Sequence, residues 1–370
     1  MAKKNRTIDY WLFLVTAILI IFGVVFLASA SSYLSQKDFG DPFYLIRHQL
    51  INLGIGITAF LFCLKINLNY FKKWFFYSFL INLLLMIFVF IPGIGTSSGS
   101  STRWLSIGGI SIQPSEFLKL SFILYLATWL SNQKNNKGAT FKKNTELTLI
   151  AFLCIISLII GILYLQSDLS TAMLILAIGG IMYFASEYPI WHTGVILSYI
   201  CLGGYVASII SPYRMSRILT FLNPGNDPLG AGYQIEQAKI AIGSGGINGV
   251  GLGMSQQSFG ILPQPISDSI FAILAEETGF IGAITLVFLF LLFAWRGFKI
   301  AREGSDIFLQ LISIGITSWI FFQAALNISA IIGLAPLTGV PLPFIGYGGS
   351  ALIAELAGTG ILLNISKNKK

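Results

Sequence analysis

Charged residues are scarce in this sequence. Only 10% of its 370 residues are Asp, Glu, Lys or Arg, whereas an ordinary soluble domain has roughly 25%. So few charges cannot cover the surface of a soluble globule. Disorder is excluded as well, because it requires low hydrophobicity and high net charge. Hydrophobic residues make up 55% of the chain and the mean hydropathy is +0.78, which predicts an integral membrane protein.

Cysteine and histidine are also rare. The three cysteines, Cys63, Cys154 and Cys201, are too scattered for a metal site and carry no information about the redox compartment. The two histidines, His48 and His192, are expected at opposite faces of the membrane. We therefore expect no shared histidine site.

Ten apolar stretches approach the ~20 residues that a helix needs to cross the hydrocarbon. They cover residues 10–31, 48–64, 74–92, 114–131, 146–164, 169–186, 190–210, 269–294, 307–332 and 347–365. The first is longer than a signal-peptide core of about 7–15 residues, so we expect an uncleaved first helix. The prediction is an all-α polytopic membrane protein, a single transmembrane domain over 1–370. It has one large outer loop, about 211–268, between the seventh and eighth membrane helices.

The basic residues indicate the orientation. With the N-terminus inside, most Lys and Arg residues lie on the inner side, in clusters at 3–6, 65–73, 134–143, 296–302 and 367–370. The outer segments hold only Lys37, Arg47, Arg103, Arg214, Arg217 and Lys239. This bias predicts that both termini are cytoplasmic. The net charge of +8 is then a topology signal, and we expect no nucleic-acid partner.

Five ionisable residues fall within the predicted spans: Glu116, Lys119, Glu276, Glu277 and Glu355. Each would cost several kcal/mol against lipid, so each should face the bundle or a wet cavity. Glu116 and Lys119 are three residues apart and can pair on one helix face. Such a pair is equally consistent with a structural role and with a functional one.

Two uncharged segments on the outer side depart from regular helix. Within the large loop, residues 243–253 are rich in glycine, which suits either close phosphate contact or tight packing of a re-entrant segment. Residues 333–350 contain Pro336, Pro341 and Pro343, which forbid a continuous helix. This second segment either dips into the membrane against protein or forms a plain outer loop.

Arginines and aspartates gather on the same side. Arg103, Arg214 and Arg217 suit an anionic phosphate group, and Asp168 and Asp268 sit at the outer ends of helices. A carboxylate beside a basic cavity is a candidate general base for a hydroxyl. Either aspartate could instead cap its helix.

Several longer motifs resemble those of the SEDS family (shape, elongation, division and sporulation). They are RWL at 103–105, QPSEFLK at 113–119, DLST at 168–171, FLNP at 221–224, GLGMS at 251–255, LP at 262–263, EETG at 276–279 and PLPF at 341–344. The similarity extends from Ser29 to about Ile365. The first outer loop, with GDPFY at 40–44, and the 221–234 stretch look closer to the division branch (FtsW-like) than to the elongation branch (RodA-like).

The resemblance implies a peptidoglycan glycosyltransferase of the bacterial cytoplasmic membrane that polymerises lipid II, working with a class B penicillin-binding protein. It implies that Asp268 is the general base. It also implies that the substrate is bound by Arg103, Glu116, Lys119, Asp168, Arg214, Arg217 and Ser255. A divalent cation, Mg or Mn, would suit the lipid diphosphate, although the sequence shows no ligand cluster for it.

The chain departs from the family pattern beside Asp268. Family members usually have Glu and His where this chain has Gln264 and Ile266, and Lys where it has Ser258. Two alternatives therefore stay open beside the polymerase. One is a lipid II flippase or other transporter, which needs alternating access, although we see no inverted repeat. The other is a non-catalytic scaffold that activates a penicillin-binding protein.

Overall fold

The computed structural model describes residues 7–98, 101–107, 110–135, 140–210, 212–223, 227 and 230–367. Ten helices lie at the ten predicted apolar stretches: α1 (Tyr10–Phe39), α2 (Tyr44–Lys65), α3 (Leu68–Phe88), α4 (Pro114–Asn135), α5 (Thr140–Leu165), α6 (Leu169–Ala185), α7 (Ile190–Ile210), α10 (Ile270–Glu303), α11 (Ile307–Ile331) and α12 (Gly349–Ser366). The predicted large loop contains two further helices, α8 (Pro212–Leu222) and α9 (Ala231–Ser244).

A small antiparallel sheet lies between α3 and α4, in the order β1 (Gly95–Ser98), β2 (Ser101–Ile107), β3 (Ile110–Ile112). The sequence analysis did not anticipate it, because its strands are too short and too polar to stand out beside the apolar runs. Apart from the sheet and the connecting segments, the described residues are helical, which confirms the all-α polytopic class.

Within the described residues, seven helices are long and apolar enough to cross a membrane: α1, α2, α3, the Thr145–Leu165 part of α5, α10, α11 and α12. The apolar helix α6 is shorter. The helix α4 has sufficient length but carries Glu116 and Lys119, and both side chains are buried. Its polar residues therefore face protein rather than lipid.

The centre of the bundle is formed by α11 and α12. In their most apolar windows 72% and 78% of residues are buried, against 22–39% for the other five membrane-length helices. The helix α12 packs along α2, and α11 packs along α10 and α4. The outer helices expose large apolar side chains instead, such as Phe280 and Phe288 on α10, as expected for a surface that contacts lipid tails.

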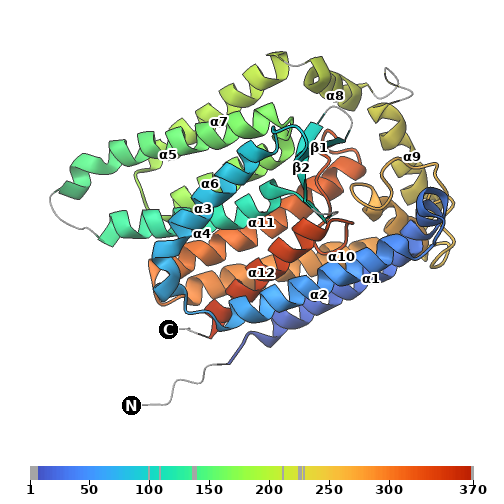
Figure 1. Ribbon diagram of the computed structural model, residues 1–370, viewed down its shortest axis with the longest axis horizontal. Coiled ribbons are helices and arrows are strands. Elements are labelled where there is room, and N and C mark those ends of the chain that lie inside the picture. Colours follow the sequence, from blue (N-terminus) through green and yellow to red (C-terminus); the bar gives the residue numbers. More distant parts are fainter. Residues whose placement is uncertain are drawn as a thin grey trace.

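The loop elements gather at one end of the bundle. Figure 1 shows the sheet, α8 and α9 at the opposite end from the beginning of α1 and the end of α12. At the end of the bundle where α1 begins and α12 ends, the backbone N–H of Asp9 donates to Ser366 Oγ at 3.1 Å. The first and last helices thus meet on the side predicted to be cytoplasmic.

Helix α10 is broken at Gly279, which has φ 68° and ψ −165°. The break releases backbone groups that pair with the glycine-rich loop. Val250 and Gly251 donate to the carbonyls of Glu276 and Glu277, at 3.0 Å each. In return, Phe280 donates to Gly246 and Ile281 to Ile247, at 2.9 and 3.3 Å. The non-helical backbone is therefore satisfied by protein, as it must be at membrane depth.

Close backbone contact requires glycine at two positions, 249 in this loop and 279 at the break. A Cβ on Gly249, whose φ is 82°, would lie 2.1 Å from the carbonyl oxygen of Glu277. A Cβ on Gly279 would lie 2.3 Å from the backbone nitrogen of Gly249. Of the two interpretations of residues 243–253, the structure supports tight packing of a re-entrant segment.

Candidate active site

Asp268 lies in the turn that leads into α10. The turn is closed by backbone hydrogen bonds from Ser267 and Ser269 to the carbonyl of Gln264, which has φ 51°. The N-cap of α10 is Ser269, and its side chain makes no capping hydrogen bond. Asp268 is therefore not the helix cap, and its carboxylate is available for another role.

Burial raises the pKa of Asp268 above its ordinary value of 3.8. Arg217, a hydrogen bond from Ser267 and Arg103 oppose this shift, whereas Asp168 adds to it. The fold thus brings two arginines and a second carboxylate close enough to act on Asp268, although the four residues are widely separated in sequence. A partly desolvated carboxylate between two guanidinium groups suits a base that works beside a negatively charged ligand.

Asp168 is the N-cap of α6, since its side chain accepts from the backbone N–H of Thr171 at 3.4 Å. It also lies 3.6 Å from Arg103 Nη1 and accepts from Ser115 Oγ at 3.3 Å. Arg103, from β2, donates in addition to the carbonyl of Ser167. The capping interpretation of Asp168 is correct, and the same carboxylate also orients an arginine of the site.

The non-helical segment 337–341 forms the wall of the site that faces Asp268, and side chains bind its backbone carbonyls. Arg217 Nη1 donates to the carbonyl of Leu337 at 2.8 Å, and Ser170 Oγ donates to that of Thr338. The segment passes close to the base, because a Cβ on Gly339 would lie 3.5 Å from Asp268 Oδ2. Most of residues 333–348 are buried or half-buried, which favours the interpretation as a segment packed into the protein.

A buried polar network lies beneath this wall. Lys119 Nζ contacts Glu116 Oε2 at 2.7 Å and Gln323 Oε1 at 2.8 Å, and the predicted ion pair is thereby confirmed. Gln323 Nε2 then donates to the carbonyl of Pro341 and to Glu355 Oε1, at 3.1 Å each. Glu355 Oε2 accepts from the backbone N–H of Phe344 at 2.8 Å. The network links α4, α11 and α12 to the segment that faces Asp268.

Glu116 and Lys119 are 3% and 0% exposed, so they support the wall from behind. Ser255 is also fully buried, and its hydroxyl donates to Glu276 Oε2 at 2.5 Å. Glu277 accepts from Ser29 and from the backbone N–H of Gly253. Ser255 and the two glutamates therefore anchor the glycine-rich loop to α10 and α1. Arg214 lies in α8, but its side chain is outside the described part of the chain.

No group of three His, Cys, Asp or Glu side chains suited to a metal ion occurs in the described residues. Asp168 and Asp268 alone do not form a metal site, and the arginines beside them disfavour a cation there. The residues present therefore do not fit a resident divalent ion.

Two residues of the site carry no charge and escaped the sequence analysis. Gln323 connects Lys119 to the wall, as described above. Asn327, one helical turn further along α11, donates to the carbonyls of Asp268 and Val340. Their spacing of four residues on an otherwise apolar helix places both on one face, which was the available signal.

The chain was compared with known proteins. Residues 10–370 match a family described as cell cycle protein and named for FtsW, RodA and SpoVE. Stage V sporulation protein E of Bacillus subtilis is 38% identical over 99% of both chains. A probable peptidoglycan glycosyltransferase FtsW of Coxiella burnetii is 36% identical, again over 99% of both chains.

Solved structures show the same architecture. A chain from a peptidoglycan synthase complex, described as coordinating polymerization and crosslinking, is 26% identical with a TM-score of 0.75. The match covers 97% of this chain and 98% of that one. The rod shape determining protein RodA of Thermus thermophilus is 23% identical with a TM-score of 0.70, over 98% of both chains, which supports the fold.

Proposed function

The chain belongs to the cell cycle protein family of FtsW, RodA and SpoVE, and from this premise we propose that it is a peptidoglycan glycosyltransferase that polymerises lipid II. The observation that carries the proposal is the position of Asp268 beside the backbone of segment 337–341, which Arg217 binds, near Arg103 and Asp168. Relatives named FtsW support the expected lean toward the division branch, whereas another relative is named for sporulation and a structural relative is RodA.

In the proposed reaction, the 4-hydroxyl of one lipid-linked disaccharide attacks the anomeric carbon of another. The new glycosidic C–O bond forms as the bond to the diphosphate breaks, and the lipid diphosphate leaves with the electron pair. Asp268 accepts the hydroxyl proton. Arg217 and Arg103 stabilise the negative charge that develops on the leaving group, and Asp168 orients Arg103.

We propose different roles for the remaining residues that were predicted to bind the substrate. Glu116 and Lys119 hold the wall through Gln323 rather than touching the substrate. Ser255 holds the glycine-rich loop that leads to Asp268. Arg214, on the same helix as Arg217, is proposed as a further contact for the diphosphate.

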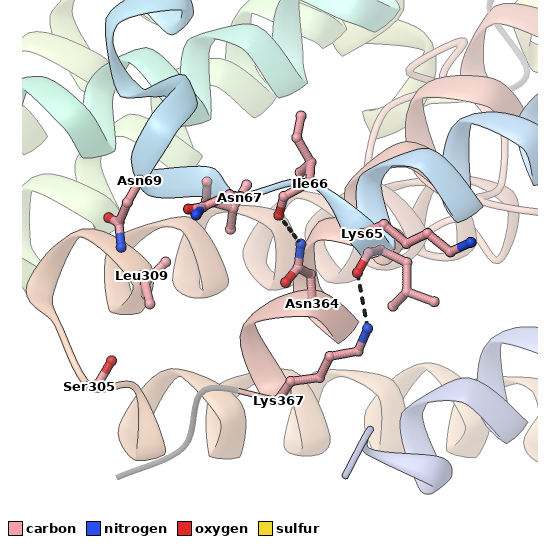
Figure 2. A pocket seen from close by; sticks show the side chains of 10 residues that line it. Lys65, Ile66, Asn67, Asn69, Ser305, Leu309, Asn364 and Lys367 are labelled. Carbon is pink, nitrogen blue, oxygen red and sulfur yellow. Dashed lines mark hydrogen bonds between the residues drawn. The ribbon is translucent and has the colours of Figure 1, made fainter. Parts of the chain in front are cut away.

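The proposal treats residues 1–370 as one transmembrane domain with both termini in the cytoplasm and the site at the outer face. Two groupings support this orientation. Arg103, Asp168, Arg217 and Asp268, all predicted to be outer, surround one site. The predicted inner residues Lys65, Ser305 and Lys367 line one cavity at the other end, shown in Figure 2. A class B penicillin-binding protein is the proposed partner, in line with the synthase complex to which a structural relative belongs.

The test is polymerisation of purified lipid II by the protein with its partner. Removal of a general base lowers turnover by about 10²–10⁴-fold, so Asp268→Ala should reduce glycan formation by that factor. Asp41→Ala, which removes an aspartate paired with Arg47 on the outer surface, is the matched control and should leave turnover unchanged. Each protein is assayed with and without Mg²⁺ or Mn²⁺.

Polymerisation that persists in Asp268→Ala would remove Asp268 from the mechanism. Movement of labelled lipid II across liposomes without polymer would favour a transporter. Rescue of depleted cells by Asp268→Asn, with no polymer made in vitro, would favour the scaffold.

A further inference from the structure

Asn327 on α11 joins the two sides of the proposed site. Its Nδ2 donates to the backbone carbonyl of Asp268 and to that of Val340, both at 2.8 Å. Asp268 belongs to the turn before α10, whereas Val340 belongs to the extended segment opposite. The residue is only 2% exposed, so water cannot replace either hydrogen bond.

The two hydrogen bonds from Asn327, which we call the clamp, set the distance between Asp268 and segment 337–341, and this distance matters for the chemistry. The carboxylate of Asp268 lies against the backbone of Gly339, the residue directly before Val340. By holding the carbonyls of residues 268 and 340 to one nitrogen, Asn327 fixes the separation at the carboxylate itself, while the backbone N–H of Tyr347 ties the same turn to the segment further along, at the carbonyl of Ile266. The other described side chains that hold the wall, Arg217, Ser170 and Gln323, bind it without binding the backbone of Asp268.

The carboxamide has no other described partner that would fix it. Asn327 Oδ1 is buried and has no hydrogen-bond partner among the described residues. Its orientation is therefore determined by the two carbonyls alone. A buried polar group that is only half satisfied is unfavourable for stability, so its presence beside the site calls for an explanation.

We propose that Asn327 is a positioning residue that holds Asp268 at its working distance from segment 337–341. The inference rests on the proposed function, in which Asp268 is the base. Asn327 acts through Asp268 and does not touch the substrate. Its loss should therefore lower turnover while leaving the binding of the lipid diphosphate, which depends on the arginines, in place.

The chain provides a matched control in Asn364 on α12. Its Nδ2 also donates to two backbone carbonyls, those of Cys63 and Ile66, at 2.9 and 2.6 Å, and it is 8% exposed. Figure 2 shows the hydrogen bond from Asn364 to Ile66 beside Lys367, in the cavity of about 650 Å³ at the end of the bundle away from Asp268. The same kind of side chain thus makes the same kind of clamp far from the proposed chemistry.

The experiment compares Asn327→Leu with Asn364→Leu in the lipid II polymerisation assay, with the partner present. Displacement of a catalytic group by about 1 Å can cost 10²-fold, so we expect kcat to fall about 100-fold in Asn327→Leu with KM within about 2-fold of wild type. Asn364→Leu should keep kcat within about 3-fold. The acidic limb of the pH–rate profile should move only in Asn327→Leu, because only there does Asp268 change its distance from Arg217.

Asn327→Asp keeps the shape of the side chain but can donate to at most one of the two carbonyls, so it breaks the link between them and should also lower kcat even if the leucine variant fails to fold. A kcat for either Asn327 variant within about 3-fold of Asn364→Leu, or an unmoved pH profile, would overturn the proposal. Asp268→Ala is measured in the same series. If Asp268→Ala is inactive while the Asn327 variants are active, only the positioning role fails; if Asp268→Ala is active, the proposed function itself fails.

Discussion

Replacement of Lys119 by methionine should destabilise the protein strongly. The ammonium is fully buried, contacts Glu116 and Gln323, and lies 5.2 Å from the centre of the Trp319 ring. The variant Lys119→Met leaves the carboxylate of Glu116, the direct partner of Lys119, in the buried network without a positive charge. Loss of one partner of a buried ion pair costs about 3–5 kcal/mol, and we expect the free energy of unfolding to fall by that amount.

The double variant Glu116→Met/Lys119→Met tests the reasoning behind this number. Replacement of both members of a buried pair by apolar residues is often neutral, so the double variant should recover to within about 1 kcal/mol of wild type. Gln323 Oε1 keeps a donor in that variant, because Trp319 Nε1 also binds it at 2.8 Å. The control Lys72→Met removes a surface pair with Asp306, for which the cost should be only about 0–1 kcal/mol.

The measurement is equilibrium unfolding by denaturant in detergent micelles, followed by tryptophan fluorescence, to which the buried Trp319 contributes. Recovery in the double variant identifies the unpaired carboxylate as the cause of the loss. A double variant as unstable as Lys119→Met would refute this account, since the loss would then come from packing of the lysine stem.

Two further predictions concern the site and the loop that supports it. Burial raises the pKa of Asp268, and Asp268 must be ionised to act as the base. Activity should therefore be lost as the pH falls through a value above 3.8. Because Arg217 lowers the pKa of Asp268, Arg217→Gln should move this acidic limb of the pH–rate profile to still higher pH. An acidic limb that stays in place in Arg217→Gln would contradict the arrangement around Asp268. Gly249→Ala should destabilise the protein by several kcal/mol in a thermal unfolding assay. Gly253 has a similar φ of 78°, but no atom lies within 4 Å of a Cβ added there. Gly253→Ala should therefore cost only about 1–2 kcal/mol of backbone strain. Equal losses in the two glycine variants would show that close contact with Glu277 is not what requires glycine at 249.

The helices were predictable because membrane spans are determined by local composition. Length and hydropathy predicted the positions of ten helices, seven of which are long and apolar enough in the described residues to cross a membrane, and the spacing of Glu116 and Lys119 predicted the ion pair. Local patterns do not report how far a helix extends beyond the hydrocarbon. For that reason α1 reaches Phe39 and α10 reaches Glu303, well past the predicted ends.

The assembly of the site was only partly predictable. The charged members, Asp268, Arg217 and Arg103, stand out in an apolar sequence, because a charge near the membrane needs a reason. Asn327 did not stand out, because an uncharged amide in a span is common and its contacts with residues 268 and 340 exist only after folding. The break at Gly279 was hidden for the same reason, since a single glycine within an apolar helix is usually tolerated.

The break in α10 has a consequence for how the protein is assembled in the membrane. The part of α10 after Gly279 contains roughly 24 residues and is about 36 Å long, sufficient to cross a hydrocarbon core of about 30 Å by itself. Before the break, the carbonyls of Glu276 and Glu277 are instead satisfied by the backbone N–H groups of Val250 and Gly251 in the glycine-rich loop. We therefore expect this span to insert without the glycine-rich loop, whereas the end of α10 beside Asp268 is completed only when that loop packs onto it.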